Sequence, residues 1–554
     1  MPDRKPGKDE ERMPDGVRVK NRGKMSVRML RKAGRQIIFI GFLLVVTGAL
    51  FCGCSAAEDS RQKDGGDTLV TGEPVTLTVF AGMDSNLEGI IMDYNDNAFF
   101  QELARRTGVN LEFAVPEFGS EHDAYYSMIA SDNFPDIISH NGYAYPEGLD
   151  AAIDDGYYLD LTPYLDTCLK DYNALRTRDS YTVKCTTTGS GRVAACYDLY
   201  SREQGPWMGL QVRKDWLDEL GLPLPVTYDD WENMLTLFRE KKGAYAPLTL
   251  GSNGALEHSH GLSAGFGVYE DFMQIENRVV YGPAQEGWKK YLSLMNRWYK
   301  KGLIDPDFMI NGEWQVDKTM VENGQTGAWN AMYIMMSQYE KSDPGMEVVP
   351  VAPPVIREGD GLHIRREDCS IGNPVTISAK CQRPEVAMML LNYLYSEEGA
   401  LLANYGIEND TFIFGADGKP QVTEKISNHP KYSMGQAQAL YLLPPNKLGG
   451  LYDWTRELSA VPEKDLLAYE VWSKGDDAYM LTKFLSYTVE ESRERSRIVS
   501  SVTRYMEDMA VKFITGVEDI NLRWDSYLKD LQEMELDRAV EITQQALDRF
   551  REEP

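Results

Sequence analysis

The strongest constraint on the fold is a regular alternation of strand-like and helix-like segments early in the chain. The run VTLTVF, residues 75–80, alternates apolar side chains with threonine, which is typical of a β-strand. Residues 97–107 then have the apolar spacing of a helix that stops at Gly108, and residues 109–115 return to a strand pattern. A further helix precedes a strand at 136–139. Strand–helix–strand units of this size predict a parallel sheet connected by helices.

Helical patterns dominate the rest of the chain. Thr227 followed by Asp230 is typical of a helix start in which the two residues cap each other. Residues 288–299 carry an apolar stripe with helical spacing, and residues 384–399 are predicted to form one helix that begins at a proline. The C-terminal region is almost entirely helical in pattern. The predicted fold class is therefore α/β with a helical C-terminal region.

The N-terminus has the order of an export signal. A basic block precedes the uncharged run 37–53, which is short for a membrane span of about 20 residues. The run ends in small residues and Cys54, an order that resembles a bacterial lipoprotein signal, although Phe51 stands where such signals usually have leucine. We expect a signal peptide over 1–53, acylation of Cys54, and a flexible tether over 54–73 at the extracytoplasmic face of the membrane. An uncleaved signal anchor is the alternative.

The charge of the chain excludes one class of partner. The net charge is −27, and the residues after position 53 carry 46 Lys and Arg against 80 Asp and Glu. An acidic body repels phosphate backbones, so no nucleic-acid partner is expected.

The seven cysteines do not form a recognisable framework. The five that follow Cys54 contain no C-x-x-C pair, so neither a zinc site nor a disulfide scaffold is predicted. Disulfides between Cys185 and Cys196, or between Cys369 and Cys381, are open in an exported protein.

Several stretches, in matching order along the chain, resemble the extracellular solute-binding proteins of ABC importers, and in particular the lipoprotein branch that usually handles oligosaccharides. Asn409 and Asp410 depart from this branch, which more often has glycine after the glutamate. The stretches that carry the resemblance are residues 156–166, 210–234, 299–308, 321–331, 404–412 and 516–531.

The resemblance implies a periplasmic-binding-protein-like fold of two α/β lobes joined by a hinge. We expect lobe 1 at 74–205 plus 370–420, and lobe 2 at 206–369 plus 421–554. It further implies a monomer, anchored to the membrane by lipid, that captures an oligosaccharide in the cleft and delivers it to ABC permease subunits. Neither a catalytic residue, nor a cofactor, nor a metal is expected.

The candidate ligand residues are those whose chemistry suits a sugar. Sugar rings have apolar C–H faces that aromatic rings cover, and hydroxyl rims that carboxylates and amides bind. In a parallel sheet such residues lie in loops after strand ends. For each candidate the alternative is a packed aromatic ring or a turn-forming polar residue. The candidates are Asp84, Asn86, Asn141, Tyr143, Tyr145, Trp207, Trp329, Asn330 and Trp454.

Three other motifs are weak. Residues 261–265 match G-x-S-x-G, but a polar, His-rich stretch precedes them where a hydrolase needs a buried strand. His258 and His260 could share one strand face, yet no third metal ligand is identifiable. Residues 93–100 begin like a calcium loop and lack the required glycine, which leaves only a different kind of calcium site.

Two alternative functions remain. An exported carbohydrate-active enzyme would also be acidic and aromatic, and it would need two carboxylates about 5–10 Å apart across a cleft. No stretch singles out such a pair. The other alternative is a binding protein for a solute that is not a sugar, such as a peptide.

Overall fold

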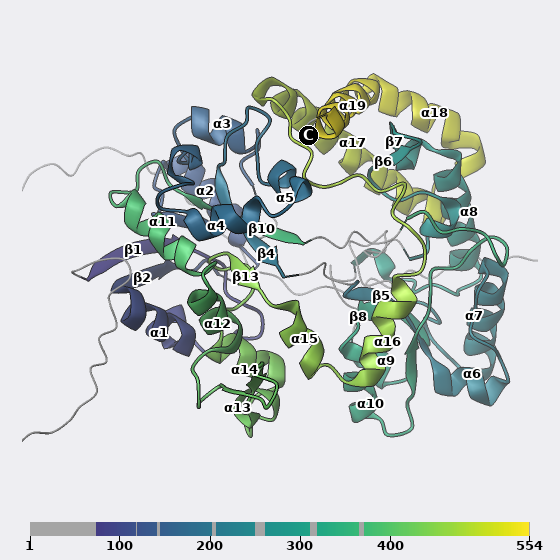
Figure 1. Cartoon of the computed structure of the whole chain (residues 1–554). Helices are drawn as coiled ribbons and strands as arrows, with labels where there is room; N and C mark the ends of the chain where they lie inside the picture. The colour runs from purple at the N-terminus through teal and green to yellow at the C-terminus, as the bar shows by residue number, and fades with distance from the viewer. Residues whose placement is uncertain are drawn as a thin grey trace, which may run out of the picture. The chain divides into compact units, whose positions relative to one another are not determined.

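The computed structural model describes residues 74–117, 119–140, 144–201, 206–249, 261–310, 318–364 and 370–552. The first of its two main sheets has six strands in the order β13-β4-β10-β3-β1-β2 (Figure 1). These strands are β1 (Val75–Phe80), β2 (Val109–Ala114), β3 (Ile137–Ser139), β4 (Ala195–Tyr200), β10 (Ile371–Ile377) and β13 (Gly450–Tyr452).

The strands of the first sheet run in one direction except for β10. β1 is parallel to β2 and β3, and β13 is parallel to β4. β10 lies between β3 and β4 and is antiparallel to both. The carboxyl ends of β1, β2, β3, β4 and β13 therefore meet at one edge of the sheet.

Helices cover both faces of this sheet. Val79 and Ile137 enter one hydrophobic core, whereas the next residues, Phe80 and Ile138, enter another. This alternation is the side-chain period of a strand buried on both faces. The first core is closed by α1 (Ala98–Thr107), α4 (Lys170–Arg176), α11 (Pro384–Tyr393) and α12 (Glu397–Tyr405), and the second by α2 (Glu121–Ser131) and α3 (Leu149–Asp154).

The second main sheet has β5 (Met208–Arg213) at its centre, antiparallel to β8 (Ala328–Met332) and to β9 (Val348–Pro350). Leu248 extends this sheet through parallel bridges to Ala328 and Ile304. Helices pack on it through large aromatic and aliphatic side chains. These helices are α6 (Lys214–Leu220), α7 (Tyr228–Lys242), α8 (Glu286–Lys300), α10 (Met335–Ser342) and α16 (Glu463–Trp472).

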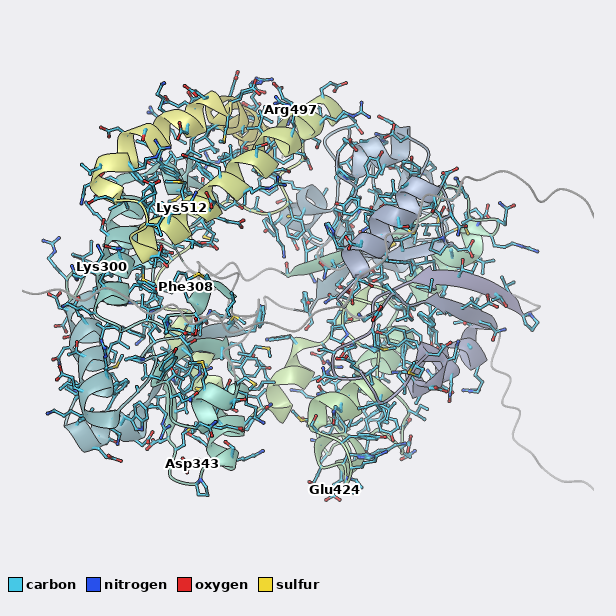
Figure 2. The ribbon with its side chains drawn as sticks, turned by 180° about the vertical axis from the view of Figure 1, so that it is seen from behind. Lys300, Phe308, Asp343, Glu424, Arg497 and Lys512 are labelled. Atoms are coloured by element: carbon cyan, nitrogen blue, oxygen red, sulfur yellow. The ribbon has the colours of Figure 1, made fainter. Side chains whose placement is uncertain are left out.

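The C-terminal region is helical, as the sequence pattern predicts. α17 (Val489–Thr515) and α18 (Ile520–Glu533) pack beside α8, and α19 (Leu536–Glu552) packs on α17 and α18. Figure 2 shows Lys300 of α8 and Lys512 of α17 on neighbouring helices. The side chain of Asn296 on α8 donates hydrogen bonds to the carbonyl oxygens of Phe513 and Ile514 at 2.9 and 3.0 Å. The C-terminal helices thus belong to the core of the second lobe.

The smaller elements connect these parts. They are α5 (Ser180–Cys185), α9 (Lys318–Glu322), α13 (Glu424–Ser427), α14 (Met434–Tyr441), α15 (Trp454–Ala460), the hairpin of β6 (Phe272–Ile275) and β7 (Arg278–Tyr281), and the hairpin of β11 (Phe412–Phe414) and β12 (Pro420–Val422).

Three connections join the lobes and form the hinge. β4 ends at Tyr200 and the chain enters the second sheet at Met208, while β9 ends at Pro350 and the chain returns to the first sheet at Ile371. The third connection runs from β13 through α15 to α16. The lobe boundary expected at residue 420 stays a prediction. Because β13 pairs with β4 and α14 packs against α1, we infer that lobe 1 extends to about Tyr452.

Most predicted elements are confirmed. The strand at 75–80 has the predicted bounds, and Asn97 and Gly108 cap α1 at its two ends. Thr227 and Asp230 form the expected reciprocal cap of α7.

The single helix predicted at 384–399 is wrong, because the structure has two helices there. α11 ends at Tyr393, and the side chain of Ser396 then caps α12 by accepting the N–H of Gly399. A Cβ on Gly399 would lie 1.8 Å from the carbonyl oxygen of Tyr393, so the glycine allows the two helices to cross closely. The sequence does hold a signal for the second helix, a serine followed by Glu397 and Glu398, which the single-helix prediction overlooked.

The disulfide between Cys185 and Cys196 is not formed, because both are free, buried thiols, whereas the pairing of Cys369 with Cys381 stays a prediction. Burial raises the pKa of Cys196 and that of Cys381. Cys369 and the predicted lipidation site Cys54 lie outside the described residues.

Candidate functional site

The carboxyl edge of the first sheet faces the second lobe, because β4 and β13 run off that edge into the hinge connections. In the second lobe, Leu248 forms parallel bridges to Ile304 and to Ala328 of β8. The three segments therefore run in the same direction. Ligands of open α/β sheets bind outside the carboxyl ends of strands. The candidate site is therefore the region between these two edges.

The loop after β1 is fixed by two polar side chains. The hydroxyl of Tyr94 donates to the carbonyl oxygen of Gly82 and accepts the backbone N–H of Asp84, both at 2.8 Å. The carboxylate of Asp84 accepts the backbone N–H of Asn86 at 2.8 Å and its side-chain amide at 3.1 Å. Asp84 is half-buried and Asn86 exposed, so this loop presents ordered polar groups at the sheet edge.

The loop before β13 passes over the same edge. The hydroxyl of Ser139, at the end of β3, donates to the carbonyl oxygen of Asn446 at 2.6 Å. His140 is buried, and its Nε2 lies 3.0 Å from the hydroxyl of Thr376 on β10. These contacts bring Lys447 onto the carboxyl edge of the sheet.

Lys447 and Asp198 place opposite charges beneath this edge. Lys447 is 3 % exposed, and burial lowers its pKa while Asp84, Glu121 and Asp198 oppose that effect. Asp198, on β4, is 0 % exposed. Burial raises its pKa to about 7 against the opposing effects of the backbone N–H of Asn373 and of Lys447. Neither carboxylate oxygen of Asp198 has a well-formed hydrogen bond.

A series of aromatic rings crosses the hinge. Tyr200 lies 5.6 Å from Tyr452 and 6.3 Å from Trp454, measured between ring centroids. Trp454 lies 6.5 Å from Tyr469 of α16, which in turn lies 4.9 Å from Tyr333 after β8. Tyr452, Trp454 and Tyr333 are buried in this series. Only Tyr200 and Tyr469 are half-buried, so these two are the rings that could cover a sugar face.

The candidates of the second lobe separate into two groups. Trp207 is half-buried at the start of β5, where its carbonyl oxygen accepts the N–H of Tyr333 at 3.0 Å. Trp329 is wholly buried, and its indole donates to the side chain of Gln211 at 2.9 Å. Asn330 is buried too, and its Oδ1 accepts no hydrogen bond. The position of Trp329 favours a packing role, and that of Trp207 a role at the site.

The remaining candidate residues are either buried within the first lobe or lie outside the described residues. Tyr145 is buried, and its hydroxyl donates to Asp155 at 2.5 Å, so its polar end is already engaged within the first lobe. Asn141 and Tyr143 lie outside the described residues. The structure thus brings Asp84 and Asn86 together at one edge and places Trp207 and Trp454 at the hinge.

Sequence reasoning missed Glu121, His140, Asp198 and Lys447. Only Asp198 has a sequence signal, since it is a lone charge inside the apolar strand ACYDLY. A charge in such a strand indicates a function or a buried partner.

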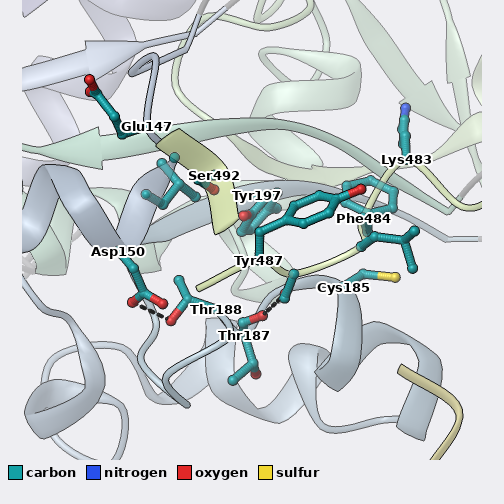
Figure 3. A pocket seen from close by; sticks show the side chains of 15 residues that line it. Glu147, Asp150, Cys185, Thr187, Thr188, Tyr197, Lys483, Phe484, Tyr487 and Ser492 are labelled. Carbon is teal, nitrogen blue, oxygen red and sulfur yellow. Dashed lines mark hydrogen bonds between the residues drawn. The ribbon is translucent and has the colours of Figure 1, made fainter. Parts of the chain in front are cut away.

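A cavity of about 190 Å³ lies where the approach to α17 meets the first lobe (Figure 3). Asp150 accepts the hydroxyl of Thr188 at 2.6 Å, and Ser486 donates to the carbonyl oxygen of Thr187 at 2.9 Å. This volume falls below the roughly 300–1,000 Å³ of small-molecule sites, so the cavity is too small for an oligosaccharide.

The weak motifs gain no support from the described residues. Ser263 is buried and directly precedes a short 3-10 helix rather than joining a strand to a helix. Asp93 caps the turn at Tyr94–Asp96. In the described part of the chain, no group of three His, Cys, Asp or Glu could hold a metal ion. His258 and His260 lie outside it.

Two lobes, three hinge connections and a polar, aromatic region between strand ends define a solute-binding protein. The family model of bacterial extracellular solute-binding proteins matches residues 93–401, and the chain belongs to this family.

Two curated relatives are similar to the chain over most of its length. "Lipoprotein LipO" of Bacillus subtilis is 21% identical over 70% of this chain and 74% of its own. The "Fructooligosaccharide ABC transporter substrate-binding protein FusA" of Streptococcus pneumoniae is 21% identical over 92% of this chain and 97% of its own. Among solved structures, the alginate-binding protein AlgQ2 has a TM-score of 0.74 and 20% identity, covering 87% of this chain and 99% of its own.

Among the described residues, no helix is both long enough and apolar enough to cross a bilayer.

Proposed function

We propose that the chain is a lipid-anchored, extracytoplasmic receptor that captures an oligosaccharide between its lobes and delivers it to an ABC permease. The observation that carries the proposal is the pairing of polar strand ends with aromatic rings at the hinge of a solute-binding fold. Asp84 and Asn86 offer acceptors and donors for hydroxyls, and Trp207, which is half-buried, offers a ring face, whereas Trp454 is buried.

Function in this proposal is a difference in affinity between the open and closed arrangements of the lobes, without a covalent step. The names of FusA and AlgQ2 support a saccharide as the solute. The name of LipO supports the lipid anchor, for which Cys54 is the proposed acylated residue.

Binding is tested with the purified protein and a panel of plant and microbial oligosaccharides. A ligand at 100 times its Kd stabilises the folded protein by about 2.7 kcal/mol, which raises the melting temperature. Titration calorimetry on the same panel gives the affinity. Absence of both a thermal shift and a heat signal across the panel would refute the saccharide proposal.

Turnover is measured in parallel. Release of labelled shorter products would indicate a carbohydrate-active enzyme, whereas reversible binding of intact oligosaccharide supports the receptor. A shift with peptides alone would replace the sugar by a different solute.

A further inference from the structure

Charged side chains gather at the carboxyl edge of the first sheet. Asp84 and Glu121 are half-buried there, and Lys447 and Asp198 are buried. The three carboxylates all act electrostatically on the ammonium group of Lys447. Three acidic groups and one basic group thus share one small region, and they come from four separate segments of the chain.

Two glycines, which have no Cβ, allow the backbone to approach the side chains of this cluster closely. A Cβ at Gly82 would lie 2.8 Å from Cγ of Glu121, so the glycine lets Glu121 lie against the loop after β1. A Cβ at Gly372 would lie 2.7 Å from Cβ of Asp198, so β10 approaches the buried carboxylate closely for the same reason.

Both buried charges lack well-formed hydrogen bonds. No carboxylate among the described residues forms an ion pair with Lys447, and no described acceptor receives a hydrogen bond from its ammonium group. Neither oxygen of Asp198 has a hydrogen bond of good geometry, although the backbone N–H of Asn373 and the ammonium group of Lys447 both act on this carboxylate electrostatically. Buried charges are normally paired and hydrogen-bonded because an isolated one is costly. An ammonium donor and a carboxylate acceptor that both lack well-formed hydrogen bonds therefore point to a bound molecule with hydroxyl groups.

We propose that this cluster restricts the receptor to uncharged oligosaccharides and rejects uronates, an inference that rests on the proposed function. Lys447 donates to a sugar hydroxyl oxygen, and Asp198 accepts a sugar O–H. A uronate carboxylate at the same place would face Asp84, Glu121 and Asp198 with a single ammonium to offset them. Specificity then comes from like-charge repulsion as well as from attraction.

Pairs of ligands that differ only in one functional group separate the effect of the ligand's charge from that of its shape. β-1,4-Mannotriose and the β-1,4-mannuronate trimer differ in having a CH₂OH or a carboxylate group, and α-1,4-galactotriose and the galacturonate trimer form a second pair. Titration calorimetry at pH 8 compares the members of each pair, with competition against a bound fluorescent oligosaccharide for weak ligands. We expect the uncharged member to bind at least ten-fold more tightly.

The outcomes separate the two proposals. Uronates that bind as tightly as, or more tightly than, their uncharged counterparts would overturn the specificity inference and leave the receptor standing. If no uncharged saccharide and no uronate of the panel binds, both proposals fail.

Two variants test the residues themselves. Lys447→Met removes the donor and should weaken binding of the uncharged trimer at least ten-fold. Asp84→Asn keeps an oxygen for the N–H of Asn86 but removes one charge, so the affinity ratio within each pair should fall several-fold. Circular dichroism and thermal unfolding check the fold of Lys447→Met, and Asp84→Asn, at a half-buried position, tests the idea independently of it.

The matched controls lie on α17. Asp508 and Lys512 form an exposed i,i+4 ion pair in the second lobe. Asp508→Asn and Lys512→Met remove the same charges and should leave both the affinity and the ratio unchanged. If they change the ratio as much as Asp84→Asn does, net charge rather than the cluster determines selection, and the inference is wrong.

Discussion

Replacing Asp198 by asparagine should change how the stability of the protein depends on pH. The pKa of Asp198 is about 7 in the folded protein against an ordinary value of 3.8, chiefly because burial disfavours the charged form. One pKa unit corresponds to about 1.4 kcal/mol, so the full difference corresponds to about 4 kcal/mol. The asparagine side chain is neutral at every pH and keeps an oxygen near the backbone N–H of Asn373.

The direction in which stability changes with pH follows from which state, folded or unfolded, holds the proton on Asp198. The folded protein keeps the proton on Asp198 at pH values at which the unfolded chain has released it. The favourable contribution is fully present below about pH 4 and is lost as pH rises through 7. Integration between pH 5 and pH 8 gives a loss of about 2.5 kcal/mol in the free energy of unfolding of the wild type. Asp198→Asn should not show this loss.

Urea denaturation at pH 5, 6, 7 and 8, followed by circular dichroism, measures the free energy of unfolding of both proteins. Other titrating groups are common to the two and cancel in the difference. The stability of Asp198→Asn relative to wild type should rise by about 2.5 kcal/mol between pH 5 and pH 8. A difference that stays constant or falls over this range would refute the reasoning. Asp508→Asn controls for removal of a carboxylate at an exposed position.

The other predictions use different parts of the molecule. Burial raises the pKa of Glu232, and hydrogen bonds from two basic neighbours and a tryptophan outweigh this effect and lower it to about 2. Glu232→Gln should therefore lose about 1–2 kcal/mol at pH 7, because the basic partners are half exposed, and this loss should shrink as pH falls from 4.5 through 2 in urea denaturation. Trp329→Ala should cost about 3–5 kcal/mol of stability, whereas Trp207→Ala should reduce oligosaccharide affinity in calorimetry with a smaller change in stability. Cys54→Ser should release the protein from the membrane fraction on cell fractionation, and retention there would contradict the lipid anchor.

Much of the fold could be predicted because its signals are local. The strand at 75–80, the caps of α1 and the cap of α7 each depend on residues that are close in sequence. The strand order could not be predicted in this way. β10 is inserted between β3 and β4 from far along the chain, and nothing in its own residues specifies those neighbours. The break between α11 and α12 depends on a close backbone contact that the apolar pattern does not encode.

The candidate site was predictable only in part for the same reason. Asp84 and Asn86 follow a strand, and that position alone marks them as candidates. Lys447 stands in a loop rich in proline and glycine, and only the folded structure shows that it is buried beside a carboxylate of β4. Trp329, in contrast, is a candidate that the sequence suggests and the structure disfavours. Its aromatic ring suits a sugar, but the hydrogen bond to Gln211 and its burial place it in the core.

The position of Asp198 links the proposed specificity to hinge motion. Asp198 pairs with Gly450 of β13, and two residues further on the same ladder joins Tyr200 and Tyr452, where both strands leave the first sheet. A hydroxyl that binds Asp198 therefore acts directly on the two strands that enter the hinge connections. A ligand shifts an equilibrium only by its difference in affinity between the two states. An uncharged sugar that completes the hydrogen bonds of Asp198 and also contacts the aromatic rings of the hinge would favour the closed state. A uronate repelled at Asp198 would lose that difference, so even when it binds weakly it should close the lobes less completely than its uncharged counterpart.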